Sequence, residues 1–186
     1  MLTVQIYTRA GDDGTTGLLY GGRVSKDSDL PWAYGTVDEA QAALGVVRTC
    51  TERDGELDRL VVQLCHDLYV AMAELATLPE NHGKLTPGTT AVSADMVAAL
   101  ETLIDGFATR FDMPTEFVIP GGTPAAAHLD VARTVVRRAE RLALRAALPD
   151  SHVVPYLNRL SDLLWAVARW AEGGSLPSRT VEGTAR

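Results

Sequence analysis

The stretch "PAAAHLDVARTVVRRAERLALRAAL", residues 124–148, decides the fold class of this chain. Its apolar residues recur at spacings of three and four, at Leu129, Ala132, Val136, Ala139 and Ala143. This spacing places them in one stripe along a helix, and such a stripe is usually buried against other helices. The proline at its start suits the first turn. The stretch therefore predicts an amphipathic helix.

Four other segments repeat this helical pattern, at about residues 31–51, 54–78, 93–110 and 155–172. Stretches that contain proline and glycine separate them, most clearly at 77–90 and 113–124. We therefore expect an all-α, five-helix up-and-down bundle with an N-terminal Gly-rich loop laid across it. Because no internal repeat is visible, we expect one domain over residues 1–186. It divides into the loop at 1–30, the bundle at 31–172 and a mobile tail at 173–186.

Composition narrows the class of protein. The chain has 186 residues and a net charge of −7, which argues against a general binder of nucleic acids or anionic membranes. No apolar run approaches the ~18 residues that a transmembrane helix needs. Only Cys50 and Cys65 are present, without a CxxC pair, and no secretory signal precedes the loop. We expect a soluble cytoplasmic protein.

The N-terminal stretch "YTRAGDDGTTGLLYGGRVSKDS", residues 7–28, has the composition of a phosphate-binding loop. Its glycines let the backbone approach a ligand, while Thr/Ser hydroxyls, Arg9, Arg23 and Lys26 can donate to anionic oxygens. The Walker pattern GxxxxGK[ST] is absent. Composition alone leaves open a nucleotide loop or a flexible polar arm.

A row of arginines follows the helix at 124–148, at Arg133, Arg137, Arg141 and Arg145, with Arg138 beside it. These guanidiniums repel one another unless carboxylates or a bound anion lie between them. Glu140 can pair with or orient Arg137. The row is either a solvated face paired with surface carboxylates, or a basic surface at an anion site or a contact with another chain.

The last helical segment contains "YLNRLSDLLWAVARWAE", residues 156–172. Asn158 and Asp162 are one turn apart beside a Leu/Trp stripe, so this edge could line a site. The alternative is a capped amphipathic helix with an internal Arg159–Asp162 pair. No Glu-x-x-His, HExxH or Cys/His zinc spacing is present, so the sequence assigns no metal ligands.

Taken together, these motifs resemble the PduO-type ATP:cob(I)alamin adenosyltransferases. The resemblance covers residues 6–169 and rests on "YTRAGDDGTTGL", "SKDS", "YGTVDEA", "FVIPGGTPAAAHLDVARTVVRRAERLAL" and "YLNRLSDLLW". It implies a five-helix bundle that assembles as a homotrimer, with ATP bound where subunits meet. The N-terminal loop closes over the nucleotide there.

The resemblance also implies functional residues. The ATP-binding set consists of Thr8, Arg9, Ala10, Gly11, Gly14, Thr15, Thr16, Lys26, Arg137, Arg138, Glu140 and Asn158. Catalytic roles fall to Arg137, Lys26 and Phe117. Cobalamin contacts fall to Phe117 and Trp165, and an intersubunit charged pair to Asp38 and Arg133.

The implied reaction transfers the 5′-deoxyadenosyl group of ATP to cob(I)alamin, giving adenosylcobalamin and tripolyphosphate. Cob(I)alamin is itself the nucleophile, so the protein supplies positioning and positive charge, with Mg²⁺ accompanying ATP. Phe117 fills the space of the lower axial ligand of cobalt. A reductase and a B12-dependent enzyme are the implied protein partners.

Two residues depart from the family pattern. Ala10 stands where a polar residue is usual, which removes one hydroxyl contact, and Trp165 stands where phenylalanine is usual, which affects the corrinoid side. The same pockets would serve a nucleotide-gated carrier that delivers adenosylcobalamin to a B12-dependent enzyme. A purely structural bundle with a disordered basic arm is the third reading.

Overall fold

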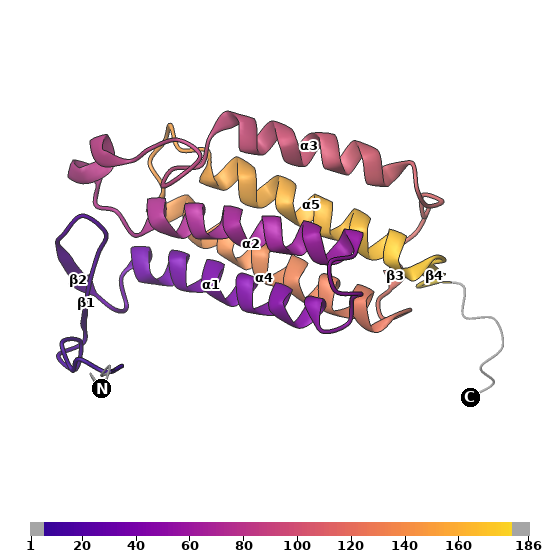
Figure 1. Cartoon of the computed structure of the whole chain (residues 1–186), viewed down its shortest axis with the longest axis horizontal. Helices are drawn as coiled ribbons and strands as arrows, with labels where there is room; N and C mark the ends of the chain where they lie inside the picture. Colours follow the sequence, from indigo (N-terminus) through magenta and orange to yellow (C-terminus); the bar gives the residue numbers. More distant parts are fainter. Residues whose placement is uncertain (1–5, 180–186) are drawn as a thin grey trace.

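A computed structural model describes residues 6–179 (Figure 1). The α-helices within this range are α1 (Asp29–Arg48), α2 (Glu56–Leu75), α3 (Ala94–Ala108), α4 (Pro124–Ala146) and α5 (Val153–Glu172). A short 3-10 helix, η1 (Pro79–Lys84), lies between α2 and α3. Each of the α-helices in the described range is too short or too polar to cross a bilayer.

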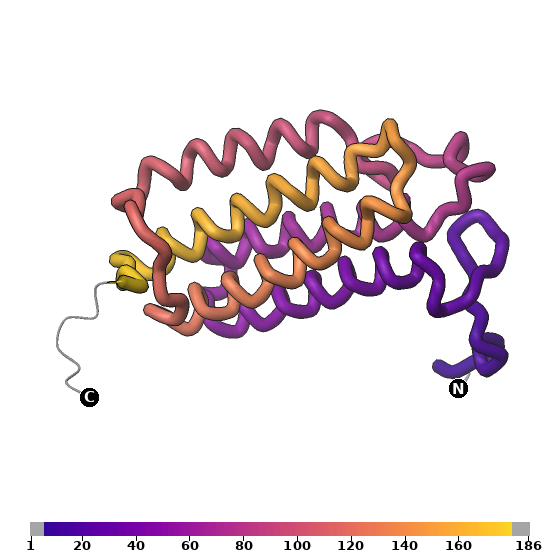
Figure 2. Tube along the Cα trace, turned by 180° about the vertical axis from the view of Figure 1, so that it is seen from behind, coloured from indigo at the N-terminus to yellow at the C-terminus, as the bar shows by residue number. Residues whose placement is uncertain are grey.

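Consecutive helices run in opposite directions along the bundle (Figures 1 and 2). Helix α1 packs against α2 and α4, while α5 packs against α4 and α3. Helix α3 covers α5 on the side away from α1 (Figure 1). The expectation of an all-α five-helix up-and-down bundle is therefore confirmed.

Burial follows the apolar stripes of the sequence. The apolar stripe of α4 is fully buried at Leu129, Ala132, Val136, Ala139 and Ala143. Helix α5 is buried around most of its circumference because α3 and α4 cover two of its sides. Its enclosed charged side chains are those of Arg169 and Glu172, each 1% exposed.

Local chemistry explains where the helices begin and end. The Thr123 hydroxyl accepts a hydrogen bond from the Ala126 amide at 3.2 Å, and Pro124 occupies the first turn, so α4 begins as expected. Helix α5 ends at Glu172 and is capped by Gly173, whose φ of 69° is left-handed. Helix α2 stops at Leu75, three residues before the boundary expected from the pattern.

Two short sheets close the ends of the bundle. At one end, β1 (Thr15–Gly17) and β2 (Arg23–Ser25) form an antiparallel hairpin. At the other, β3 (Val118–Ile119) pairs with β4 (Leu176–Pro177). The sequence predicted neither sheet, and the N-terminal loop lies at the bundle end rather than across it (Figure 1). Of the tail expected to be mobile, residues 180–186 lie outside the described residues.

An ion pair fixes the turn between α1 and α2. Nε of Arg48 donates to Oδ1 of Asp58 at 2.7 Å, and the Asp54 amide donates to Oδ2 at 3.1 Å. Asp58 is only 4% exposed. The hydrogen bond from Arg48 and the backbone amide hold the pKa of Asp58 below its usual value.

We expect Asp58→Asn to destabilise the chain at neutral pH more than at acid pH. A carboxylate whose pKa is lower in the folded state stabilises fully above its unfolded pKa of about 3.9, and this stabilisation is lost as pH falls through the folded pKa. Urea unfolding of both proteins at pH 7 and below pH ~4 measures the difference. Glu52→Gln, a change at an exposed neighbour, is the control. If the difference in unfolding free energy between wild type and Asp58→Asn is the same at both pH values, the ionised carboxylate of Asp58 does not stabilise the fold.

Candidate functional site

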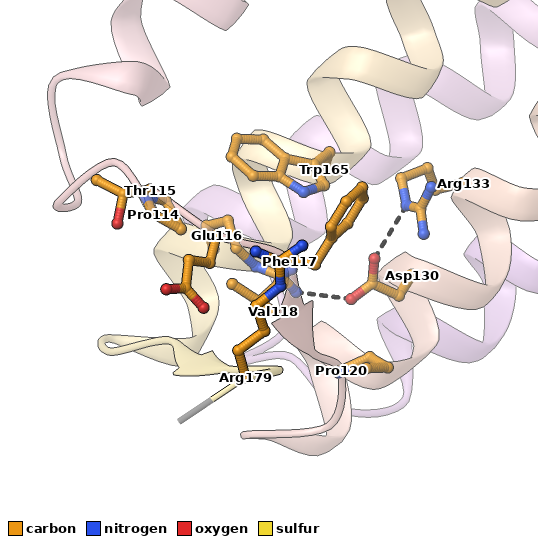
Figure 3. A pocket seen from close by; sticks show the side chains of 11 residues that line it. Pro114, Thr115, Glu116, Phe117, Val118, Pro120, Asp130, Arg133, Trp165 and Arg179 are labelled. Carbon is orange, nitrogen blue, oxygen red and sulfur yellow. Dashed lines mark hydrogen bonds and ion pairs between the residues drawn. The ribbon is translucent and has the colours of Figure 1, made fainter. Parts of the chain in front are cut away.

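A cavity of about 590 Å³ opens at the β3–β4 end of the bundle (Figure 3). Segment 114–120, α4 and α5 supply its walls. The lining combines two aromatic side chains, Phe117 and Trp165, with five charged ones, Glu116, Asp130, Arg133, Arg169 and Arg179. A mostly apolar concavity with a few convergent polar groups is the usual form of a small-molecule site.

Phe117 is the most unusual residue of this cavity. Phe117 is 88% exposed, although it directly precedes strand β3, which pairs with β4. Phe117 is therefore not an ordinary core aromatic. Trp165 on α5 is half-buried and meets the ring of Phe111 edge-on, with centroids 5.9 Å apart. An exposed ring at a cavity mouth favours binding of an apolar surface.

The opposite wall is charged. Nε of Arg133 donates to Oδ1 of Asp130 at 3.0 Å, and Nη2 of Arg169 donates to Oδ2 at 2.6 Å. Nε of Arg169 also lies 3.0 Å from Oε2 of Glu172, although these two atoms are not aligned for a hydrogen bond. Sequence reasoning missed Asp130 and Arg169 as site residues. The available signal was a charge beside the apolar stripe of each helix.

The second candidate region is the N-terminal loop. Hydrogen bonds from cationic side chains of the loop stabilise its conformation. Nη2 of Arg23 donates to the Ala10 carbonyl and to the Thr15 hydroxyl, each at 2.6 Å. Nζ of Lys26 donates to the Gly11 carbonyl at 2.7 Å. A Cβ added at Gly11 would lie 2.9 Å from Nζ of Lys26, so the ammonium group would have to shift from this position. The network brings together the predicted loop residues, and it adds Arg23, which the predicted site set omitted.

Hydrogen bonds also order the turn that leads into β1. The Thr15 amide and hydroxyl both donate to Oδ1 of Asp13, at 2.9 and 2.8 Å, and lower the pKa of that carboxyl. Thr8, Arg9 and Ala10 remain exposed to solvent, and Arg9 has a left-handed φ of 61°. A flexible arm does not describe this segment.

The hairpin docks on the C-terminal end of α2. The Leu19 amide donates to the Ala76 carbonyl at 2.8 Å. A Cβ at Gly22, whose φ is 90°, would meet the Leu78 side chain at 2.4 Å. Nζ of Lys84 lies 5.9 Å from the centre of the Tyr20 ring. The loop is thereby attached to the bundle at a defined place.

The arginine row of α4 is only partly neutralised. Arg138 forms an ion pair with Glu39 of α1, and Nη1 of Arg141 donates to the Arg137 carbonyl at 2.9 Å. Arg137 is exposed, and no ion pair to its guanidinium forms within residues 6–179. The row therefore combines paired arginines with at least one available cation.

Asn158 and Glu140 contact each other across α5 and α4. Nδ2 of Asn158 donates to Oε1 of Glu140 at 3.0 Å, so Glu140 orients Asn158 rather than Arg137. Arg159 contacts Glu101 of α3 at 2.9 Å and not Asp162, so the predicted internal pair is wrong. Two of the predicted ATP-binding residues are thus adjacent.

Other predicted site residues are not brought together within one chain. The β1–β2 hairpin and the segment that leads into β3, which carries Phe117, lie at opposite ends of the bundle (Figure 1). Asp38 is exposed on α1, whereas Arg133 contacts Asp130. Within residues 6–179, no three His, Cys, Asp or Glu side chains gather as a metal site.

Comparisons with known proteins agree on one family. A family model described as cobalamin adenosyltransferase matches residues 6–171. A corrinoid adenosyltransferase of Mycobacterium bovis is 41% identical over 174 residues, which cover 90% of this chain and 88% of the relative. The corrinoid adenosyltransferase PduO of Citrobacter freundii is 41% identical over 167 residues, covering 88% of this chain and 49% of that protein.

Solved structures give the same result. A variant PduO-type ATP:corrinoid adenosyltransferase from Lactobacillus reuteri, complexed with cobalamin and ATP, superposes with a TM-score of 0.84 at 28% identity. The match covers 95% of this chain and 97% of that one. A further variant of the Lactobacillus reuteri enzyme, complexed with ATP, gives a TM-score of 0.82 and covers 94% and 100% of the two chains.

We expect Arg23→Ala to loosen the N-terminal loop without unfolding the bundle. The change removes the hydrogen bonds to the Ala10 carbonyl and the Thr15 hydroxyl, and no bundle residue depends on them. Limited trypsin digestion should cut after Arg9 several times faster, because cleavage of a locally opened segment follows its open population. Arg53→Ala, at an exposed arginine outside the loop, should cut after Arg9 at the wild-type rate. Equal rates in both variants would show that Arg23 does not hold the loop.

Proposed function

The chain belongs to the cobalamin adenosyltransferase family, and we propose that it transfers the 5′-deoxyadenosyl group of ATP to the cobalt of cob(I)alamin. The products are adenosylcobalamin and tripolyphosphate. The observation that carries the proposal is the family match over residues 6–171, which includes both the cation-held loop and the cavity of Phe117.

The transfer is a displacement at carbon. The electron pair of Co(I) forms the Co–C5′ bond, cobalt becomes formally Co(III), and the C5′–O bond breaks with its electrons on the departing triphosphate. No protein nucleophile or general base is required. The protein contributes by holding C5′ in line with cobalt and by stabilising the charge that builds on the leaving group.

The cationic parts of the chain suit the triphosphate. Lys26 uses one hydrogen bond for the Gly11 carbonyl, and an ammonium group has three donors, so two remain for phosphate oxygens. Arg137 adds an exposed guanidinium without an ion pair within residues 6–179. The Gly11 amide, which has no acceptor within residues 6–179, supplies a further donor. We assign the ATP site to this loop, to Arg137, Arg138 and Glu140, and to Asn158.

We propose that the site is completed between subunits of a homotrimer. The loop and the cavity of Phe117 lie at opposite ends of one chain, so a second chain has to supply one of them (Figure 1). Asp38 lies exposed on α1 and could reach Arg133 of a neighbour, whose terminal guanidinium nitrogens are not engaged by Asp130. The proposed role of the Asp38–Arg133 pair is to hold neighbouring subunits together.

The corrinoid is assigned to the cavity of Phe117 and Trp165. The exposed Phe117 ring can occupy the lower face of cobalt and exclude an axial ligand from it. Loss of that ligand makes reduction of Co(II) to Co(I) more accessible. Mg²⁺ enters with ATP as part of the substrate, since phosphate oxygens and water are the ligands that it commonly keeps.

The proposal includes a single domain over residues 1–186 and a cytoplasmic location. It also includes a separate reductase that supplies Co(I) and a B12-dependent enzyme that receives the product. The two cysteines without a CxxC pair and the acidic net charge of −7 support the location.

The direct test is incubation with Mg-ATP and chemically reduced cobalamin. We expect the absorption spectrum of adenosylcobalamin to appear together with stoichiometric tripolyphosphate. Phe117→Ala should lower turnover with Co(II) under a reductant more than turnover with preformed Co(I), because the ring acts on the reduction step. If both ligands bind but no tripolyphosphate forms, the protein is not an adenosyltransferase, and the result favours a nucleotide-gated carrier of adenosylcobalamin.

A pair of arginine variants separates catalysis from assembly. Arg137→Ala should lower kcat/KM for ATP by about 100- to 1000-fold, the typical loss when one donor to a developing charge is removed, and leave the oligomer intact. Arg133→Ala should also shift the oligomer towards monomer in sedimentation velocity. Identical behaviour of the two variants would show that the arginine row is wrongly assigned.

A further inference from the structure

A carboxylate shared by two arginines forms one wall of the cavity (Figure 3). Asp130 is 6% exposed, and each of its oxygens accepts one hydrogen bond from a different guanidinium. The first comes from Arg133 one turn along α4, and the second from Arg169 on α5. Asp130 thus joins the two helices at the point where the cavity opens.

Arg169 depends on this carboxylate. Its side chain is 1% exposed, and a buried cation is costly unless a counterion and hydrogen bonds satisfy it. Glu172 lies close to its Nε, but without hydrogen-bond alignment. Within residues 6–179, Asp130 therefore gives Arg169 its one aligned side-chain hydrogen bond.

Arg169 in turn contacts an aromatic wall of the cavity. Its guanidinium carbon lies 5.8 Å from the centre of the Trp165 ring, within the range of a cation–π contact. The arginine also lines a second cavity of about 790 Å³ that shares segment 114–116 with the first. A shift of Arg169 would therefore move the boundary between both cavities.

Arg133 is the partly exposed member of the network, with 28% of its side chain accessible. Only its Nε is engaged within residues 6–179, so the hydrogen bond to Asp130 sets the plane of the guanidinium and leaves the terminal nitrogens available. One terminal nitrogen can pair with Asp38 of a neighbouring chain, as proposed above, and the other then suits a carbonyl acceptor at the edge of a bound molecule. The corrin macrocycle carries amide carbonyls along its edge.

We propose that Asp130 is a positioning residue for the corrinoid, an inference that rests on the proposed function. It fixes the guanidinium of Arg133 toward the corrin amides, and it fixes Arg169 beneath Trp165, so that the cavity keeps the shape that receives the macrocycle. Asp130 touches neither cobalt nor ATP. Its removal therefore affects corrinoid binding and coordination rather than nucleotide use.

The test compares Asp130→Asn with Asp58→Asn. Both variants remove a buried carboxylate that pairs with an arginine, but Asp58 lies in the first turn of α2 and lines neither cavity. Asp130→Asn should raise the KM for cob(I)alamin by about 10- to 100-fold, the range that corresponds to loss of a charge-assisted hydrogen bond. The KM for ATP and kcat should change less than about threefold. Asp58→Asn should leave all three constants unchanged.

A spectroscopic measurement gives a second readout. In the presence of ATP, electron paramagnetic resonance of bound cob(II)alamin reports whether the lower axial ligand is lost. We expect Asp130→Asn to keep more of the axially ligated form than wild type, and Asp58→Asn to match wild type. Wild-type spectra and kinetic constants in Asp130→Asn would overturn the inference.

Two further outcomes are distinguishable. If wild type makes no adenosylcobalamin, the proposed function is wrong, and the positioning role of Asp130 is wrong with it. If Asp130→Asn does not fold by circular dichroism, Arg133→Lys takes its place, because a lysine keeps the charge but has no planar fork. A rise in the corrinoid KM of Arg133→Lys, with the oligomer intact, supports the inference, and an unchanged KM overturns it.

Discussion

The buried charge of Arg169 constrains the end of the bundle where the corrinoid is proposed to bind. This guanidinium sits on the most enclosed helix, so carboxylates from its surroundings have to approach it. Asp130 supplies one from α4, and Glu172 supplies another from the last turn of α5. Oε1 of Glu172 also accepts a hydrogen bond from the Gly122 amide at 3.3 Å. One buried cation thereby connects α4, α5 and the loop that presents Phe117.

At the hairpin end of the bundle the cations are exposed instead of buried. Their acceptors are backbone carbonyls of the same loop. Arg23 and Lys26 fold the loop through the carbonyls of Ala10 and Gly11. A loop shaped before the ligand arrives loses less conformational entropy on binding than a free arm would. Because these contacts use carbonyls, the lack of a hydroxyl at Ala10 does not disturb them. The departure from the family pattern at this position therefore leaves the loop's internal scaffold in place.

The helices could be predicted from sequence because each stripe repeats within a few residues, and the buried positions of α4 were among those named from the pattern. The β3–β4 sheet could not, since β3 pairs with a strand almost sixty residues later and each of these two strands has only two residues. Strands β1 and β2 have three residues each, too few to show an alternating pattern. The Phe117 and Arg137 assignments came from motif resemblance, not from periodicity. Asp130 and Arg169 escaped both approaches. Each has one ion-pair partner three residues along its own helix, Arg133 for Asp130 and Glu172 for Arg169. Nothing in that spacing reports the contact of Asp130 with Arg169 across the core.

The proposed trimer would bring together parts of the site that one chain holds apart. The hairpin end of one chain has available donors, while the exposed Arg137 lies on the middle of α4 and Phe117 at the far end. Bringing the loop to these residues joins two different surfaces of the chain, which is a heterologous contact. A head-to-tail contact of this kind gives a closed ring when the rotation between neighbouring chains closes. The proposed homotrimer is such a ring, in which the loop of each chain meets the next chain.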